Sequence, residues 1–210
     1  MTDSLHDRTL AYYDGNAEAF WQGTRDHDVS QNIDALLGQI QGEGPFDILD
    51  FGCGPGRDLK AFTDLGHRAI GLDGSARFVE MARAHSGCEV WHQSFLSLDL
   101  PGRFFDGIFA NASLFHVPGG ELPRILGQLR AALKPEGILF ASNPHGDDRE
   151  GISGGRFGAY HSPERWAELV GAAGFTEILR YFRPAGLPRE RQPWLATLFR
   201  NSDAAGRRDR

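Results

Sequence analysis

Apolar and polar residues follow one another along the chain with two different periods. Short apolar runs that end in glycine or turn residues, such as ILDF at 48–51 and ILFAS at 138–142, predict buried β-strands. Apolar residues at helical spacing, as in SQNIDALLGQI at 30–40, predict amphipathic helices. The expected strands are 47–52, 67–73, 88–94, 104–111, 138–143, 175–182 and 194–200, and helices are expected within 1–45 and at 57–66, 76–85, 121–133 and 163–174.

This order of elements predicts a fold class. Strands that alternate with helices form a mostly parallel sheet with helices on both faces, so we expect an α/β, Rossmann-like doubly wound sheet. The last two strands have no helix between them, which predicts an antiparallel strand near the C-terminus. The glycine-rich segment 145–160 is expected to be a loop or lid.

We expect one domain over residues 1–210 and divide it into four parts. Residues 1–45 form a helical N-terminal cap, 46–143 a ligand-binding core, 144–200 a lid loop with the substrate-side part, and 201–210 a flexible tail.

Composition narrows the class of protein. Hydrophobic residues make up 40% of the 210 and charged residues 24%, which is the balance of a soluble globular protein. No apolar run approaches the roughly 18 residues of a membrane-spanning helix, and the polar N-terminus is unlike a signal peptide. With only two cysteines a disulfide framework is not expected, which favours a cytoplasmic protein. The net charge of −6 disfavours a nucleic acid as the main partner.

The segment ILDFGCGPGRD at 48–58 joins an expected strand to an expected helix, the setting of a nucleotide-binding glycine loop. Gly52, Gly54 and Gly56 lack Cβ atoms, so the backbone can turn sharply and a ligand can lie against it. The N–H groups at the start of the helix suit an anionic carboxylate. The spacing G-x-G-x-G differs from the dinucleotide fingerprint, in which a third glycine would replace Arg57.

Two acidic residues accompany this loop. Asp73 ends the second expected strand, where its carboxylate could accept hydrogen bonds from both hydroxyls of a ribose or could instead cap the following helix. Asp50 lies two residues before the first glycine and could accept a hydrogen bond from a ligand ammonium group. We expect no metal site.

With these motifs in this order, residues 45–182 resemble the class I S-adenosylmethionine (SAM)-dependent methyltransferases. LDFGCGPGRD is similar to the first motif of that family and GLDGS to the acidic end of its second strand. FDGIFANASLFHV resembles its fourth strand and exit, LKPEGILFAS its turn and fifth strand, and AGF the entry to its sixth.

The resemblance implies SAM as the cofactor, S-adenosylhomocysteine (SAH) as the product, and a role for each matching residue. The residues implied around the methionine part of SAM are Asp50, Gly52, Gly54, Gly56, Asn111 and Ala112. Those implied at the nucleoside are Asp73 for the ribose, and Ser94 and Phe95 for the adenine, and Gly74 is also implied to bind the cofactor. Many family members have an acidic residue where this chain has Ser94, whose hydroxyl would make a weaker contact.

Candidate catalytic residues follow the fourth and fifth strands. His116 is the best-placed imidazole for proton abstraction from the acceptor. Asn143 could orient the acceptor or simply cap its turn, and Tyr160 could reach the site from the lid or anchor the loop.

Candidate substrate-binding residues come from the cap and from isolated arginines. Tyr13 belongs to an aromatic segment that either packs on the sheet or touches ligand. Arg25, Arg156 and Arg183 are the cations that could bind an anionic acceptor, because a guanidinium binds a carboxylate through two hydrogen bonds. His116 could contribute here as well.

The hypothesis that follows is methyl transfer from SAM to a nitrogen, oxygen or sulfur of a small molecule, by in-line displacement promoted by positioning and desolvation. One alternative is an RNA or protein methyltransferase, and another is a nicotinamide-dependent oxidoreductase. The sequence does not decide between a monomer and a homodimer.

Overall fold

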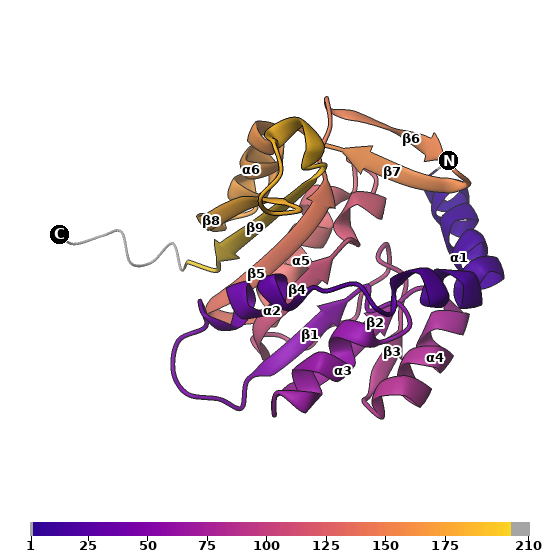
Figure 1. Cartoon of the computed structure of the whole chain (residues 1–210). Helices are drawn as coiled ribbons and strands as arrows, with labels where there is room; N and C mark the ends of the chain where they lie inside the picture. Colours follow the sequence, from indigo (N-terminus) through magenta and orange to yellow (C-terminus); the bar gives the residue numbers. More distant parts are fainter. Residues whose placement is uncertain (1, 203–210) are drawn as a thin grey trace.

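The computed structural model describes residues 2–202, which build a seven-stranded sheet between two layers of helices (Figure 1). The spatial order of the strands is β3-β2-β1-β4-β5-β9-β8. From β3 to β5 all neighbours are parallel, and β9 is antiparallel to both β5 and β8. The strands are β1 (Asp47–Phe51), β2 (Arg68–Asp73), β3 (Val90–His92), β4 (Phe105–Asn111), β5 (Leu133–Pro144), β8 (Thr176–Arg183) and β9 (Trp194–Arg200). The predicted fold class is confirmed, and the edge strand is β8 because β9 inserts between β5 and β8.

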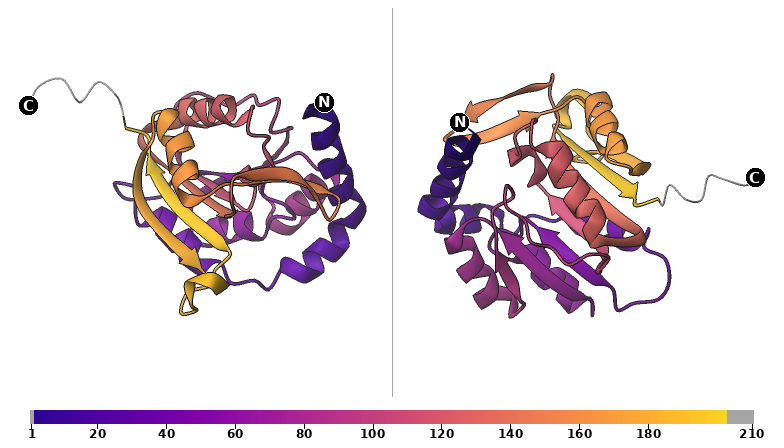
Figure 2. Two further views of the ribbon diagram at one scale, coloured as in Figure 1. Left: turned by 90° about the horizontal axis from the view of Figure 1, so that it is seen from above. Right: turned by 180° about the vertical axis from the view of Figure 1, so that it is seen from behind.

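Both faces of the central strands are covered, which explains their continuous apolar runs. Successive side chains of β1 enter different cores. Ile48 packs with Phe62 of α3 (Arg57–Asp64), whereas Leu49 packs with Leu129 of α5 (Leu122–Ala132). One face carries α2 (Ser30–Leu37), α3 and α4 (Ala76–Ser86), and the other carries α5 and α6 (Pro163–Ala172) (Figure 2).

The segment predicted as a loop or lid, 145–160, is instead a β-hairpin of β6 (Arg149–Ser153) and β7 (Arg156–Tyr160). Gly154 and Gly155 form its two-residue turn with φ angles of 56° and 84°, values that favour glycine. The hairpin lies beside α1 (Thr2–Thr24), where the Phe157 N–H donates a hydrogen bond to Thr9 Oγ1 over 2.9 Å (Figures 1 and 2). Two segments far apart in sequence thus meet at one end of the sheet.

Other differences from the prediction are local. The third strand begins only at Val90, because α4 runs to Ser86 and is followed by a turn at Gly87 with φ 72°. Asn201, predicted to begin a flexible tail, is buried and its N–H donates to the Gly137 carbonyl over 2.8 Å. Positions 203–210 of that tail lie outside the described residues. Within the part of the chain that is described, no helix has the length and apolarity needed to cross a membrane.

Candidate functional site

A cavity of about 600 Å³ lies at the carboxyl ends of β1, β2 and β4, where ligands bind in open α/β sheets. Its volume is within the range of small-molecule sites. The glycine loop, the exit of β4, α1, β7 and the β8–β9 connection all contribute to its wall. The sequence-predicted residues that line it are Gly52, Gly54, Asp73, Gly74, Phe95, Asn111, Ala112, Tyr13, His116, Arg156 and Arg183.

The three motif glycines have different neighbours. A Cβ atom at Gly54 would point at the cavity, with Phe20 Cε1 3.8 Å away as its only close neighbour. A Cβ at Gly52 would lie 2.4 Å from Ser113 Cβ, and one at Gly56 would lie 2.8 Å from Ala82 Cα. Gly56 does not line the cavity and instead lets α3 approach α4. Gly54 is therefore the glycine at which the backbone itself is open to a ligand.

Asp73 is held in place by backbone donors. Its Oδ2 accepts a hydrogen bond from the Gly54 N–H over 2.9 Å and its Oδ1 accepts one from the Ser75 N–H over 2.8 Å. Burial raises the pKa of Asp73 to about 6. The residue whose side chain caps α4 is Ser75, because its Oγ accepts a hydrogen bond from the Phe78 N–H. Asp73 is therefore not the side-chain cap of this helix. The Gly74 N–H also stabilises the Asp73 carboxylate. A carboxylate can accept about four hydrogen bonds, so these donors leave acceptor capacity for a ribose hydroxyl.

Asp50 is buried below the cavity and does not line it. Its Oδ2 has no hydrogen-bond partner, and burial together with the Asp58 carboxylate raises the pKa of Asp50 well above its usual value. The acidic group that reaches the cavity from α3 is Asp58, which pairs with Arg57 over 2.6 Å. Asp58, which the start of α3 brings into place, was not singled out from the motif, and the assignment of Asp50 to the methionine part of SAM stays a prediction.

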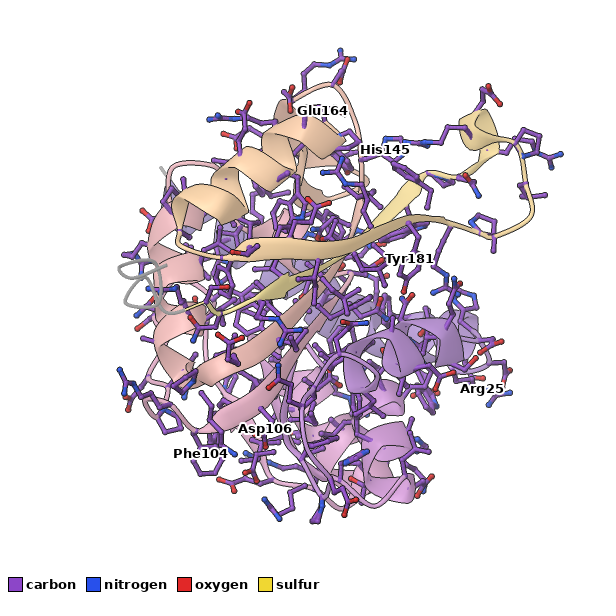
Figure 3. The ribbon with its side chains drawn as sticks, turned by 90° about the vertical axis from the view of Figure 1, so that its left-hand side faces the viewer. Arg25, Phe104, Asp106, His145, Glu164 and Tyr181 are labelled. Atoms are coloured by element: carbon purple, nitrogen blue, oxygen red, sulfur yellow. The ribbon has the colours of Figure 1, made fainter. Side chains whose placement is uncertain are left out.

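A chain of hydrogen bonds links this acid to the cap and to the edge of the sheet. Asn111 Nδ2 donates to Asp58 Oδ2 over 3.0 Å, and Asn111 Oδ1 accepts from Asn32 Nδ2 over 3.1 Å. The Tyr181 hydroxyl donates to Asn32 Oδ1 over 2.8 Å, where β8 meets α2 (Figure 3). On the other side, Arg57 Nη1 donates to the Thr24 carbonyl at the end of α1 over 2.7 Å. Sequence reasoning missed Asn32 and Tyr181, since nothing local marks them.

At the predicted adenine end, Phe95 lines the cavity and stacks on Phe51 with 4.4 Å between ring centroids. Ser94 does not line it: Ser94 Oγ accepts from the Leu96 N–H and lies 2.7 Å from Nε2 of His6. His6, on α1, lines the cavity instead. The contact spans 88 positions in the sequence, so no short motif could have found it.

On the opposite side, three polar side chains from different elements meet. Tyr13 OH lies 2.7 Å from His116 Nε2, and Arg156 Nη1 donates to the same hydroxyl over 3.1 Å. His116 Nδ1 lies 2.6 Å from the Phe157 carbonyl oxygen. Burial lowers the pKa of His116 to about 4 and raises that of Tyr13. The imidazole is therefore neutral near pH 7.

Besides Asp50, Gly56 and Ser94, three more predicted site residues lie outside the cavity wall. Asn143 accepts the Phe115 N–H at its Oδ1 over 3.2 Å and so holds the turn after β4 rather than the turn after its own strand. Tyr160 covers Gly158, with its hydroxyl 2.7 Å from where a Cβ would be. Arg25 is exposed, pairs with Asp26 over 3.3 Å and points away from the fold (Figure 3). None of the three lines the cavity.

Arg183 lines the cavity beside Pro184 and Trp194, and its Nη2 donates to the Asp28 carbonyl over 3.0 Å. Across residues 2–202 there is no group of three or more histidine, cysteine or acidic side chains that could hold a metal ion.

Sequence comparisons point to one family. A family model described as a methyltransferase domain matches residues 48–137. A trans-aconitate 2-methyltransferase of Paracidovorax citrulli is 32% identical over 150 residues, which cover 69% of this chain and 56% of that protein. A ubiquinone biosynthesis O-methyltransferase of Rhodopseudomonas palustris is 33% identical over 104 residues, or 45% of this chain and 38% of that protein. The chain thus spans about half of the first relative and less of the second.

Structural comparison agrees on the fold. The crystal structure of a Burkholderia thailandensis 1,6-didemethyltoxoflavin-N1-methyltransferase, with 1,6-didemethyltoxoflavin and SAH bound, matches with a TM-score of 0.79 and 22% identity. The match covers 97% of this chain and 91% of that one. The antiparallel β9 also departs from the six parallel strands of a dinucleotide-binding fold. By its glycine loop, its strand order and these similarities, the chain belongs to the class I SAM-dependent methyltransferases.

Proposed function

We propose that the protein transfers a methyl group from SAM to a nitrogen, oxygen or sulfur atom of a small anionic molecule. The observation that carries the proposal is that one cavity joins the glycine loop and Asp73 to two arginines, Arg156 and Arg183. A relative that acts on trans-aconitate, a carboxylate, supports an anionic acceptor.

The cofactor side of the proposal assigns roles to residues that line the cavity. The open backbone at Gly54, with Asn111 and Ala112, borders the methionine part, while Asp73 accepts from the ribose and Gly74 and Phe95 border the adenine. When bound, SAM supplies an electrophilic methyl group on a positively charged sulfur. The protein has to hold the acceptor in line and exclude water, and the apolar walls formed by Phe20, Phe115 and Trp194 are suited to that.

The acceptor side rests on charge. Arg57 pairs with Asp58, but among the side chains of residues 5–202 no carboxylate oxygen lies within 4.0 Å of Arg156 or Arg183. Arg183 helps to lower the pKa of Asp28, but the two side chains form no ion pair. Arginines that form no ion pair at a cavity wall favour a negatively charged ligand. Within this proposal residues 1–45 act as a cap, 46–143 hold SAM, and the hairpin with the rest of 144–200 faces the acceptor. The protein is proposed to work in the cytoplasm as a monomer or homodimer.

Titration calorimetry with SAH and with NAD⁺ tests the proposal. SAH should bind and raise the melting temperature, as a ligand of the native state does, and NAD⁺ should not. Absence of SAH binding, or tighter binding of NAD⁺, would contradict it. SAH release from SAM with a panel of small carboxylic acids then tests the acceptor class.

A further inference from the structure

Both ring nitrogens of His116 are engaged, which fixes the direction of its hydrogen bonds. The Phe157 carbonyl oxygen, 2.6 Å from Nδ1, can only accept, so Nδ1 carries the proton of the neutral ring. Nε2 is then an acceptor, and Tyr13 OH, 2.7 Å away, donates to it. His116 therefore cannot take a proton directly from an acceptor molecule in the cavity, because Tyr13 occupies the nitrogen that would receive it.

Tyr13 has capacity for one more partner. Its oxygen donates to His116 and accepts from Arg156 Nη1, which uses one of its two lone pairs. The phenol lines the cavity, so the remaining lone pair is available to a hydroxyl or N–H group of a bound molecule.

Burial keeps both Tyr13 and His116 neutral at rest, and the charged groups around the pair act on its proton in both directions. Arg156, on β7, lies within hydrogen-bond distance of the Tyr13 oxygen and would stabilise negative charge there. Asp73 and Tyr12 oppose negative charge on Tyr13 and raise its pKa, and the positive charges of Arg156 and His6 lower the pKa of His116. The charge that the sulfonium loses during methyl transfer is what offsets these effects. The neutral imidazole has an empty acceptor position pointed at the phenol proton, and the Phe157 carbonyl would stabilise the imidazolium that forms.

We propose that Tyr13 is a catalytic residue that accepts the proton of the methyl acceptor while passing its own proton to His116, so that the methylated atom is a hydroxyl oxygen or a ring N–H nitrogen of an anionic molecule. This inference rests on the proposed function and narrows it. A carboxylate needs no base at neutral pH, so such a relay would have no role if the carboxylate itself were methylated.

The step balances in charge and atoms. The acceptor atom bonds to the methyl carbon, the carbon–sulfur bond breaks, and its electron pair remains on sulfur. The acceptor proton moves to the Tyr13 oxygen and the Tyr13 proton moves to His116 Nε2, so the positive charge lost at sulfur appears on the imidazolium. Because the total charge of the cavity is unchanged, protonation of a buried imidazole is far less costly than it would be alone. The proton leaves His116 for water when the products depart.

Matched acceptor pairs test the chemistry. The probes are para-hydroxybenzoate with para-methoxybenzoate, and indole-carboxylate with its N-methyl derivative, with SAH release measured and products identified by mass spectrometry. The free hydroxyl and N–H members should be methylated at oxygen or nitrogen and their blocked partners should not. Tyr13→Phe should lower kcat by about 100-fold, the size of a general-base effect, with little change in KM. Its deficit should shrink as pH rises past the pKa of the acceptor.

Tyr12→Phe is the control, since Tyr12 neighbours Tyr13 on α1 and does not line the cavity. A methyl ester product, equal losses in Tyr12→Phe and Tyr13→Phe, or no turnover of any probe while SAH still binds would each overturn the inference. Failure of SAH to bind would contradict the proposed function instead of the relay. A readout independent of turnover is the ¹⁵N spectrum of His116, which should show a protonated Nδ1 and an unprotonated Nε2; the opposite tautomer excludes the relay.

Discussion

The backbone N–H of Gly54 donates a hydrogen bond of 2.9 Å to Oδ2 of Asp73, nineteen positions further along the chain. The bond ties the turn of the glycine loop to the end of β2, and both of its partners line the cavity. The carboxylate expected to hold a ribose therefore also helps to fix the loop expected to hold the methionine part.

Asp73→Asn should weaken SAH binding by about 10- to 100-fold, because hydrogen bonds to a charged group contribute about 1.5–3 kcal/mol. An amide oxygen can still accept from Gly54, so the fold should be retained. Calorimetry with SAH measures the loss. Asp64→Asn, an exposed acid on α3 that pairs with Lys60, is the matched control and should leave the affinity unchanged. If Asp73→Asn and wild type bound SAH equally well, Asp73 would not be a cofactor-binding residue.

SAH affinity should also depend on pH through Asp73. Burial raises the pKa of this carboxyl from 3.8 to about 6, so it takes up a proton as pH falls through about 6. If SAH requires the ionised form, proton binding competes with it, and the affinity should be constant above pH 7 and about tenfold weaker at pH 5. In Asp73→Asn this dependence should disappear, and a variant with the same pH profile as wild type would assign the effect to another group.

Alanine substitutions at two glycines of the loop should have different effects, one mainly on the stability of the protein and the other mainly on SAH binding. Gly56→Ala would place a Cβ 2.8 Å from Ala82 Cα at a φ of 93°, so unfolding should become easier by roughly 1–3 kcal/mol or more. Gly54 has a φ of 53°, and an added Cβ would meet only Phe20, at an ordinary contact distance of 3.8 Å. Gly54→Ala should therefore cost only about 1 kcal/mol in stability while weakening SAH binding. Gly66→Ala, with φ 85° and open space around it, controls for backbone strain alone and should not change affinity. Thermal melts and calorimetry separate the three, and unimpaired SAH binding by Gly54→Ala would show that the loop is not the cofactor site.

The fold was predictable because its strands are buried on both sides. In an apolar run such as ILDF, around Leu49, side chains on both faces of the strand have to be buried, which requires helices on both faces of the sheet. That arrangement is observed. The β6–β7 hairpin was missed because β6 is exposed along its whole length and so carries no apolar alternation. Its one local signal, Gly154-Gly155, is equally typical of a flexible loop.

The cofactor side of the site was likewise easier to predict than the acceptor side. Gly54 and Asp73 belong to motifs whose spacing alone brings them to one edge of the sheet. Asn143 also ends a strand at that edge, but its side-chain oxygen accepts a hydrogen bond from the Phe115 N–H. This contact depends on how the strands pack, so the spacing of residues in the sequence does not predict it. The Tyr13–His116 contact joins positions 103 apart in the sequence, from a helix whose placement no local pattern specifies.

Asn32 should matter for both stability and ligand binding. It is buried and bridges Tyr181 to Asn111, which lines the cavity. Asn32→Ala should destabilise the protein by about 1–3 kcal/mol, since partners are left unsatisfied, whereas Tyr181→Phe removes one hydroxyl and should cost about 1 kcal/mol. Urea denaturation measures both, with the exposed Asn16→Ala as the control. SAH affinity should fall in Asn32→Ala because the Asn111 side chain loses the hydrogen bond that orients it. Unchanged affinity would show that this hydrogen-bond network does not contribute to SAH binding.

Arg183 offers a test of the anionic acceptor. Arg183→Gln should raise KM for para-hydroxybenzoate by about 10- to 100-fold, as expected for a lost charge-assisted hydrogen bond, and leave SAH affinity unchanged. Arg180→Gln removes the same charge from the same strand, but Arg180 pairs with Glu177 and does not line the cavity, so its KM should match wild type. A neutral amide of the same acceptor should be used equally poorly by Arg183→Gln and wild type, because the guanidinium then has no charge to bind. If Arg183→Gln and Arg180→Gln raise KM alike, the effect comes from the net charge of β8, and the acceptor anion must be held elsewhere.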